Sequence, residues 1–69
     1  MSRKHYRELA RVLRSYGNTL RTDNEKDAWG QMCLEVGRVL ARENDRFHMG
    51  VWLNACAEWL WYAYPEEVA

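Results

Sequence analysis

The most reactive side chains in this sequence belong to two cysteines and two histidines, Cys33, Cys56, His5 and His48. Thiolate and imidazole are ligands that zinc prefers, and a structural zinc site normally includes two of them only a few residues apart. No such pair occurs here, so no metal site is predicted. Both cysteines fall among apolar residues at helical spacing, where free cysteine packs as a small hydrophobe. A disulfide between them is the alternative, since facing helices could bring them together.

The sequence lacks the other features that enzyme active sites usually have. A catalytic cysteine needs an exposed and activated thiolate, whereas both cysteines are expected to be buried. The sequence has no glycine-rich phosphate loop and no paired carboxylates beside a cleft, and three short helices enclose little pocket volume. We therefore expect a protein without catalytic residues and without a cofactor.

Four arginines near the N-terminus recur at helical spacing. Arg3, Arg7, Arg11 and Arg14 lie four, four and three residues apart, which places them on one helix face. Such a face could contact the phosphates of a nucleic acid. However, it offers almost none of the Asn, Gln, Ser and Thr side chains that read base edges. The favoured interpretation is a solvent-exposed basic face, and the alternatives are a nucleic-acid contact and an acidic protein partner.

The strongest signal for binding is the aromatic content of the C-terminal part. The chain has nine aromatic residues, four of them Trp, in 69 positions, and a domain of this size lacks the interior to cover them all. Trp and Tyr are enriched at the energetic centres of protein interfaces. We therefore predict a protein-binding surface at Trp59, Trp61, Tyr62 and Tyr64. The alternative is that the other helices wrap around both sides of this segment.

Three helices must position these groups, and their ranges follow from apolar periodicity and end signals. We expect helices over residues 3–16, 23–42 and 48–64. Ser2 is a candidate N-cap for the first, and Thr22 forms a capping-box pattern with Glu25 before the second. The third should end before Pro65, which cannot continue a helix without cost. The acidic residues after Pro65 are expected to form a frayed tail.

The predicted core consists of apolar residues three and four positions apart in each helix. They are Tyr6, Leu9, Val12, Leu13 and Tyr16 in the first, Ala28, Trp29, Met32, Cys33, Val36, Val39 and Leu40 in the second, and Met49, Trp52, Leu53, Cys56, Leu60 and Ala63 in the third. Phe47 should plug the core where the third helix begins. Gly30 and Gly37 cost about 1 kcal/mol each relative to alanine inside a helix, which suggests that the first or the third helix packs closely there; the alternative is that the fold simply tolerates them. The fold class is all-α: one domain, residues 1–69, forming a small three-helix bundle with the aromatic C-terminal helix central.

The chain is neutral overall, but its charges are unevenly distributed. Residues 1–22 contain six basic residues and one acidic residue, whereas residues 23–69 contain four basic and nine acidic residues. We interpret the asymmetry as complementarity between packed helices, because a neutral chain gains no long-range attraction to phosphate. Neither a signal-peptide pattern nor a membrane-spanning run is found. The expected location is therefore the cytoplasm, without membrane contact.

Two short pieces of the sequence match a known pattern. They are Lys4-His5-Tyr6 and the stretch 43–56, which contains Glu-Asn-Asp-Arg-Phe followed by Val-Trp-Leu-Asn-Ala-Cys. These pieces resemble a group of very short proteins from bacteriophages of actinobacteria, many of which carry Asn-Pro-x-Phe-Asp and then Phe-Leu-x-Ala-Cys. The sequence departs from that pattern at Asp45, at His48 and in its longer aromatic extension. The resemblance implies a phage-encoded protein in the host cytoplasm, and it implies no activity.

The expected function is that of a small non-enzymatic protein-interaction module. It would be phage-encoded, act on a host or phage protein, and associate with itself as a homodimer. The alternative is a small nucleic-acid-binding or transcription-modulating protein that uses the basic face of the first helix.

Overall fold

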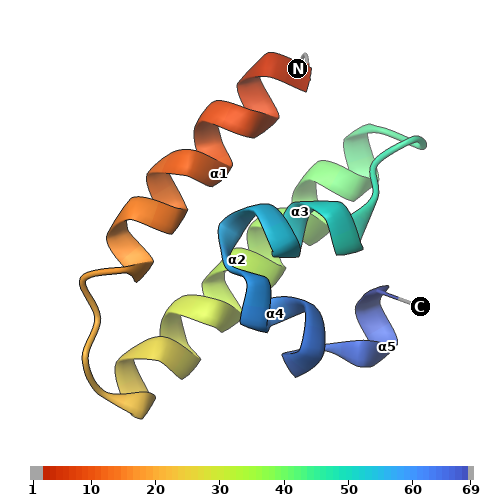
Figure 1. The fold of residues 1–69 in the computed structure, drawn as a ribbon. Helices are drawn as coiled ribbons and strands as arrows, with labels where there is room; N and C mark the ends of the chain where they lie inside the picture. Colours follow the sequence, from red (N-terminus) through yellow and green to blue (C-terminus); the bar gives the residue numbers. More distant parts are fainter. Residues whose placement is uncertain (1–2, 69) are drawn as a thin grey trace.

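The computed structural model describes residues 3–68, and this part of the chain forms five helices and no strand. They are α1 (Arg3–Gly17), α2 (Asp23–Glu43), α3 (Met49–Cys56), α4 (Glu58–Ala63) and α5 (Pro65–Val68). The predicted N-cap Ser2 lies outside the described residues. The short helix α3 contacts each of the other four helices, and Figure 1 shows it crossing in front of α2, with α1 to one side. The all-α class is therefore confirmed, but the molecule is not strictly a three-helix bundle.

The prediction of one continuous helix over 48–64 was wrong, because the chain bends at Ala57. This residue has an extended backbone, with φ −168° and ψ 138°, and separates α3 from α4. Its N–H still donates to the Leu53 carbonyl at 2.9 Å. The bend turns α4 back so that Leu60 is fully buried next to Gly30 of α2. Helical periodicity continues through the bend, and for this reason the sequence pattern did not reveal it.

A second break lies at Tyr64, directly before Pro65. Tyr64 has φ −127° and ψ 65°, since a proline ring clashes with a helical conformation of the residue before it. Proline is well suited to the first position of a helix, and here it begins the short helix α5. The tail that was expected after Pro65 therefore begins as a short helix over the described residues up to Val68.

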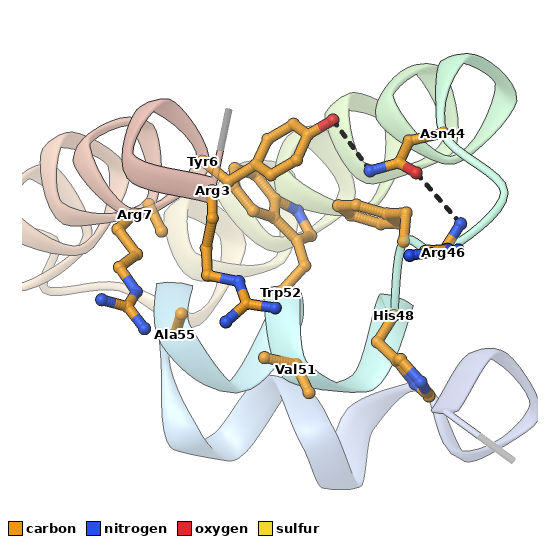
Figure 2. A pocket seen from close by; sticks show the side chains of 11 residues that line it. Arg3, Tyr6, Arg7, Asn44, Arg46, His48, Val51, Trp52 and Ala55 are labelled. Atoms are coloured by element: carbon orange, nitrogen blue, oxygen red, sulfur yellow. Dashed lines mark hydrogen bonds between the residues drawn. The ribbon is translucent and has the colours of Figure 1, made fainter. Parts of the chain in front are cut away.

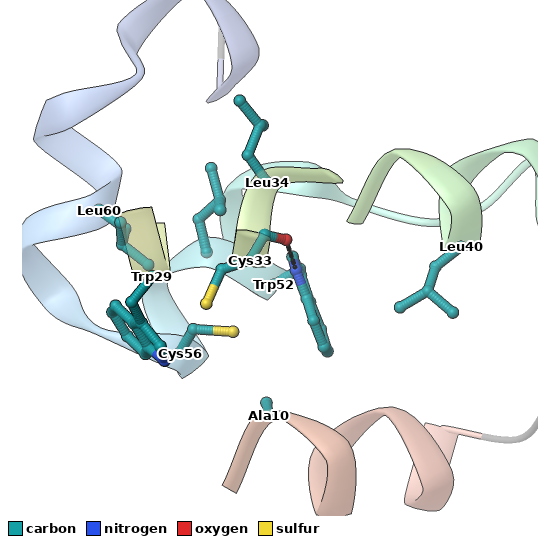
Figure 3. Close-up of a cluster of buried hydrophobic side chains, with 9 residues drawn as sticks. Ala10, Trp29, Cys33, Leu34, Leu40, Trp52, Cys56 and Leu60 are labelled. Carbon is teal, nitrogen blue, oxygen red and sulfur yellow. Dashed lines mark hydrogen bonds between the residues drawn. The ribbon is translucent and has the colours of Figure 1, made fainter. Parts of the chain in front are cut away.

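The buried core gathers residues from α1, α2, α3 and α4. It comprises Ala10, Trp29, Cys33, Leu34, Leu40, Trp52, Leu53, Cys56 and Leu60. Trp52 is 4% exposed, and its indole N–H donates to the Cys33 carbonyl at 2.9 Å, as Figure 3 shows. A buried indole needs such an acceptor. The predicted burial of Trp52 in the third segment is therefore confirmed.

The buried sides of α1 and α2 are rotated from the predicted stripes. In α1 only Ala10 is buried, whereas Val12 and Tyr16 are 65% and 61% exposed. In α2, Met32 and Val39 are 46% and 44% exposed, while Leu34, which the predicted stripe omitted, is buried. The physical reason is that small residues face the partner helices, so that backbones approach there and larger apolar side chains are displaced outward.

Gly37 is the clearest of these close approaches. A Cβ atom built at this position would lie 2.6 Å from the Met49 sulfur and 2.7 Å from Cδ1 of Trp52. At Gly30 a Cβ would lie 3.0 Å from the end of the Leu60 side chain. The prediction that another helix packs closely against these two glycines is confirmed, and the neighbours come from α3 and α4.

Local signals at two helix starts behave as predicted. Thr22 and Glu25 form a capping box, in which the Glu25 N–H donates to the Thr22 hydroxyl and the Thr22 N–H donates to the Glu25 carboxylate. Hydrogen bonds with Thr22 lower the pKa of Glu25, the bond from the Thr22 backbone most of all. Before α3, the Phe47 ring packs on the Trp52 ring at a centroid distance of 6.2 Å. This contact across the first turn is a hydrophobic staple.

Candidate protein-binding surface and basic pocket

Helix α4 presents two of the four predicted interface aromatics side by side. Trp59 and Tyr62 lie three residues apart on α4, and they are 41% and 80% exposed. Both line a hollow of about 510 Å³ between the end of α1 and the start of α4. Its remaining lining residues are Arg14, Asn18, Ala57 and Glu58. We call Trp59, Tyr62 and this hollow the α4 surface.

The other two predicted interface residues lie elsewhere. Trp61 is 40% exposed, but its ring rests on Gly50 of α3, where an added Cβ would be 2.6 Å from the ring. Tyr64 is partly buried, with its hydroxyl beside Gly30. Burial, followed by the negative charge of Asp27, raises the pKa of Tyr64. The structure therefore separates the four aromatics, because the bend at Ala57 and the break at Tyr64 redirect them.

The predicted basic face of α1 is also divided. Arg14 turns toward the C-terminal end of α3, where its guanidinium donates to the carbonyls of Asn54 at 3.3 Å and Ala55 at 3.0 Å. It also lies 3.9 Å from the Glu58 carboxylate. The last carbonyls of a helix have no partner within the helix and carry partial negative charge, so a guanidinium stabilises them. Arg14 thus joins α1 to α3, a role that depends on tertiary contacts and has no sequence signal.

Arg3 and Arg7 line a second pocket, between α1, α3 and the loop that joins α2 to α3. Its volume is about 550 Å³, and Figure 2 shows its side chains. We call it the basic pocket. It is lined by Arg3, Tyr6, Arg7, Ala10, Asn44, Arg46, Phe47, His48, Val51, Trp52 and Ala55. Three of these residues are arginines and none is Asp or Glu. Arg11 is exposed and lies outside this lining.

Hydrogen bonds and ring contacts fix the wall formed by the loop. The Asn44 side-chain amide donates to the Tyr6 hydroxyl at 3.3 Å, and its oxygen accepts from the Arg46 N–H at 3.0 Å. The Phe47 ring meets the Tyr6 ring edge-on, at 5.8 Å and 73°. The loop was expected only to break the chain between two helices, and neither Asn44 nor Arg46 was identified as a candidate site residue.

The two cysteines lie side by side in the core. Both are free thiols with no exposed surface, and their sulfurs point toward each other in Figure 3. The hydrogen bond with Cys33, followed by burial, raises the pKa of the Cys56 thiol. Among residues 3–68, no group of three or more His, Cys, Asp or Glu side chains is placed to hold a metal ion.

Within the described part of the chain, no helix has the length and apolar character that crossing a membrane requires. The sequence matches no protein-family model, and neither a curated protein nor a solved structure is significantly similar to it.

Proposed function

We propose that this protein is a non-enzymatic protein-interaction module that associates with a second copy of itself through the α4 surface. The observation that carries the proposal is the exposure of Trp59 and Tyr62 beside a hollow. Trp and Tyr are enriched among the few residues that dominate the binding energy of protein interfaces. Resemblance to short actinobacteriophage proteins supports a role in the cytoplasm of an infected host cell.

A second copy fits this surface because the surface is self-complementary in charge. A two-fold interface places the same patch of both copies against each other. The hollow contains one group of each sign, Arg14 and Glu58, whose side chains are 43% and 81% exposed. Two-fold pairing can therefore bring Glu58 of one copy near Arg14 of the other, with the aromatic rings between them.

The proposed absence of catalysis rests on where the nucleophilic groups lie. Both thiols are buried in the core and line neither the hollow nor the basic pocket. A thiol acts as a nucleophile only as an accessible thiolate.

Sedimentation velocity at tens of micromolar tests the self-association. The wild type should sediment as a dimer, and the double variant Trp59→Lys with Tyr62→Lys should sediment as a folded monomer. The matched control is Val12→Lys with Tyr16→Lys, which replaces two exposed apolar side chains on α1. A monomeric wild type, or a control variant that dissociates while the α4 variant remains dimeric, would contradict the proposal.

The second candidate is a nucleic-acid-binding protein, and the observation in its favour is the placement of Arg3 and Arg7 beside aromatic residues in one pocket. Its test is a mobility shift of labelled duplex at about 150 mM salt, where non-specific binding is normally weak. A shift at low micromolar protein that Arg7→Glu with Arg11→Glu abolishes would favour this function. The engagement of Arg14 with α3 weakens the candidate, because it removes one cation from the face.

A further inference from the structure

The basic pocket is a second surface, separate from the α4 surface, and its composition specifies a ligand. It combines cationic groups, Arg3, Arg7 and Arg46, with an apolar lining in which Tyr6 and Phe47 are prominent. No ion pair joins these three arginines to any residue that the structure describes. Three guanidinium groups around one concave space create a site for negative charge. The volume of about 550 Å³ lies within the usual range for ligand sites.

The positions of the arginines indicate an extended ligand rather than a single small anion. Figure 2 shows Arg7 and Arg46 at opposite ends of the pocket, with Arg3 between them and the apolar wall behind. Arg3 and Arg7 come from adjacent turns of α1, and Arg46 comes from the loop before α3. One carboxylate cannot contact both ends. A ligand that does so carries separate negative groups with an apolar group between them.

The polar groups of the pocket argue against the recognition of nucleic-acid bases by this site. Asn44 is the one side-chain amide in the lining, and both its amide N–H group and its oxygen are engaged, with Tyr6 and Arg46. Base recognition requires such groups to be available. What the pocket mainly offers is guanidinium donors and apolar surface, with the His48 imidazole at its edge.

We infer that the basic pocket binds an acidic peptide segment of another protein, with one apolar side chain inserted against Tyr6 and Phe47 and flanking carboxylates on Arg3, Arg7 and Arg46. Arginine pairs with carboxylates through two parallel hydrogen bonds, which gives such a contact direction as well as strength. The inference does not depend on the α4 surface, because no residue lines both sites.

The probe is a dye-labelled Glu-Glu-Phe-Glu-Glu peptide, titrated with the full chain at about 150 mM salt so that distant charges are screened. Binding is read as fluorescence anisotropy. Replacing the Phe of the peptide by Ser, or its Glu residues by Gln, should each weaken binding about tenfold or more. These two controls change only the peptide, so they do not depend on how a protein variant folds.

Protein variants locate the site. Arg3→Glu with Arg7→Glu should weaken peptide binding about tenfold or more. The matched control, Arg11→Glu with Arg21→Glu, makes the same change in net charge at exposed positions outside the pocket and should leave binding nearly unchanged. Circular dichroism establishes that both variants are helical. Trp59→Lys with Tyr62→Lys should also retain peptide binding, which separates this inference from the proposed dimer.

Several results would overturn the inference. One is the absence of binding by the wild type, and another is an equal loss in the two arginine variants, which would indicate a diffuse basic face. Equal affinity for the wild-type probe and the Ser-containing peptide would show that the apolar side chain of the ligand contributes nothing to binding. An eight-residue oligothymidylate that binds more tightly than the peptide and displaces it would assign the pocket to nucleic acid instead.

Discussion

At the scale of single residues, Trp52 holds a central position in this domain. Its ring packs on Phe47 at 6.2 Å and lies against Gly37, and its N–H donates to the Cys33 carbonyl. The same side chain also forms part of the floor of the basic pocket. One residue therefore connects α2, the loop before α3 and the pocket.

Replacing Trp52 by Ala should destabilise the domain by about 3–5 kcal/mol, because the change removes buried apolar area and leaves a cavity. A loss of this size is comparable to the whole stability of many small domains. Trp61→Ala is the matched control, since Trp61 is 40% exposed, and it should cost clearly less. Denaturant unfolding followed by circular dichroism measures both. Equal losses in the two variants would show that Trp52 does not have this central role.

The Glu25 carboxylate gives the domain a specific response to acid. Folding lowers its pKa through the hydrogen bonds with Thr22, so the folded state holds this proton less tightly than the unfolded state. The stabilisation is therefore present above the unfolded pKa and is lost as pH falls through the folded pKa. Glu25→Gln keeps an acceptor for the capping box but cannot ionise. The difference in melting midpoint between wild type and Glu25→Gln should be positive at neutral pH and should shrink in strong acid; a constant difference would contradict this assignment.

At the scale of helices, the two interior glycines of α2 differ in how much space they leave. An added Cβ at Gly37 meets the indole of the buried Trp52, whereas at Gly30 the nearest atom is the end of the Leu60 side chain. A leucine tip can move by a few tenths of an ångström, but a packed indole has little freedom. The gain in helix propensity from Gly to Ala, about 1 kcal/mol, is the same at both positions.

Gly37→Ala should therefore destabilise the domain, because overpacking typically costs about 1–3 kcal/mol and exceeds the propensity gain. Gly30→Ala should be close to neutral, since the two terms nearly cancel there. Chemical denaturation of the two variants, compared directly, measures the difference. A Gly37→Ala variant as stable as Gly30→Ala would show that α3 does not pack against Gly37 as closely as described.

Local signals in the sequence were more informative than tertiary ones. The helix ends at Thr22 and before Pro65 follow from the chemistry of a few neighbouring residues, and the sequence predicted them correctly. The bend at Ala57 was not predictable, because alanine favours a helix and only the burial of Leu60 against α2 explains the turn. The apolar stripes predicted the buried faces of the helices only approximately. In α2 the glycines bring neighbouring helices close, so that the buried side is shifted away from Met32 and Val39.

The candidate site was also predictable only in part, because local patterns indicate which residues are exposed but not which helices meet. The exposure of Trp61 and Tyr62 off the main stripe agrees with the sequence pattern. The inward turn of Arg14 and the contribution of Arg46 to the basic pocket depend on which helices meet, and no spacing in the sequence encodes that.

At the scale of the whole molecule, charge complementarity between the two halves is limited. Of the three ion pairs among residues 3–68, one, Arg14 with Glu58, joins the basic N-terminal part to the acidic remainder. The packing of the helices therefore depends mainly on the apolar core, and the helices contribute unequally to this core. Helix α2 contributes six buried residues, whereas α1 contributes Ala10 alone. The helix that forms one wall of the basic pocket is thus the long helix with the fewest fully buried residues, although Tyr6, Leu9 and Leu13 also pack against the core as partly buried residues.

This imbalance predicts that α1 opens separately from the rest of the domain. Segments held mainly by partly buried side chains open at lower free energy than the global unfolding of the protein, so amides of α1 should exchange with deuterium faster than those in the middle of α2. Arg14→Gln should accelerate exchange in α1 selectively, because it weakens the hydrogen bonds to the Asn54 and Ala55 carbonyls. Ser15→Gln, at an exposed position of the same helix, is the control.

Hydrogen exchange read by NMR or mass spectrometry measures the wild type and both variants. Equal protection in α1 and α2 would contradict the prediction, whereas slower exchange in α1 on addition of the acidic peptide would show that the ligand holds α1 against α3.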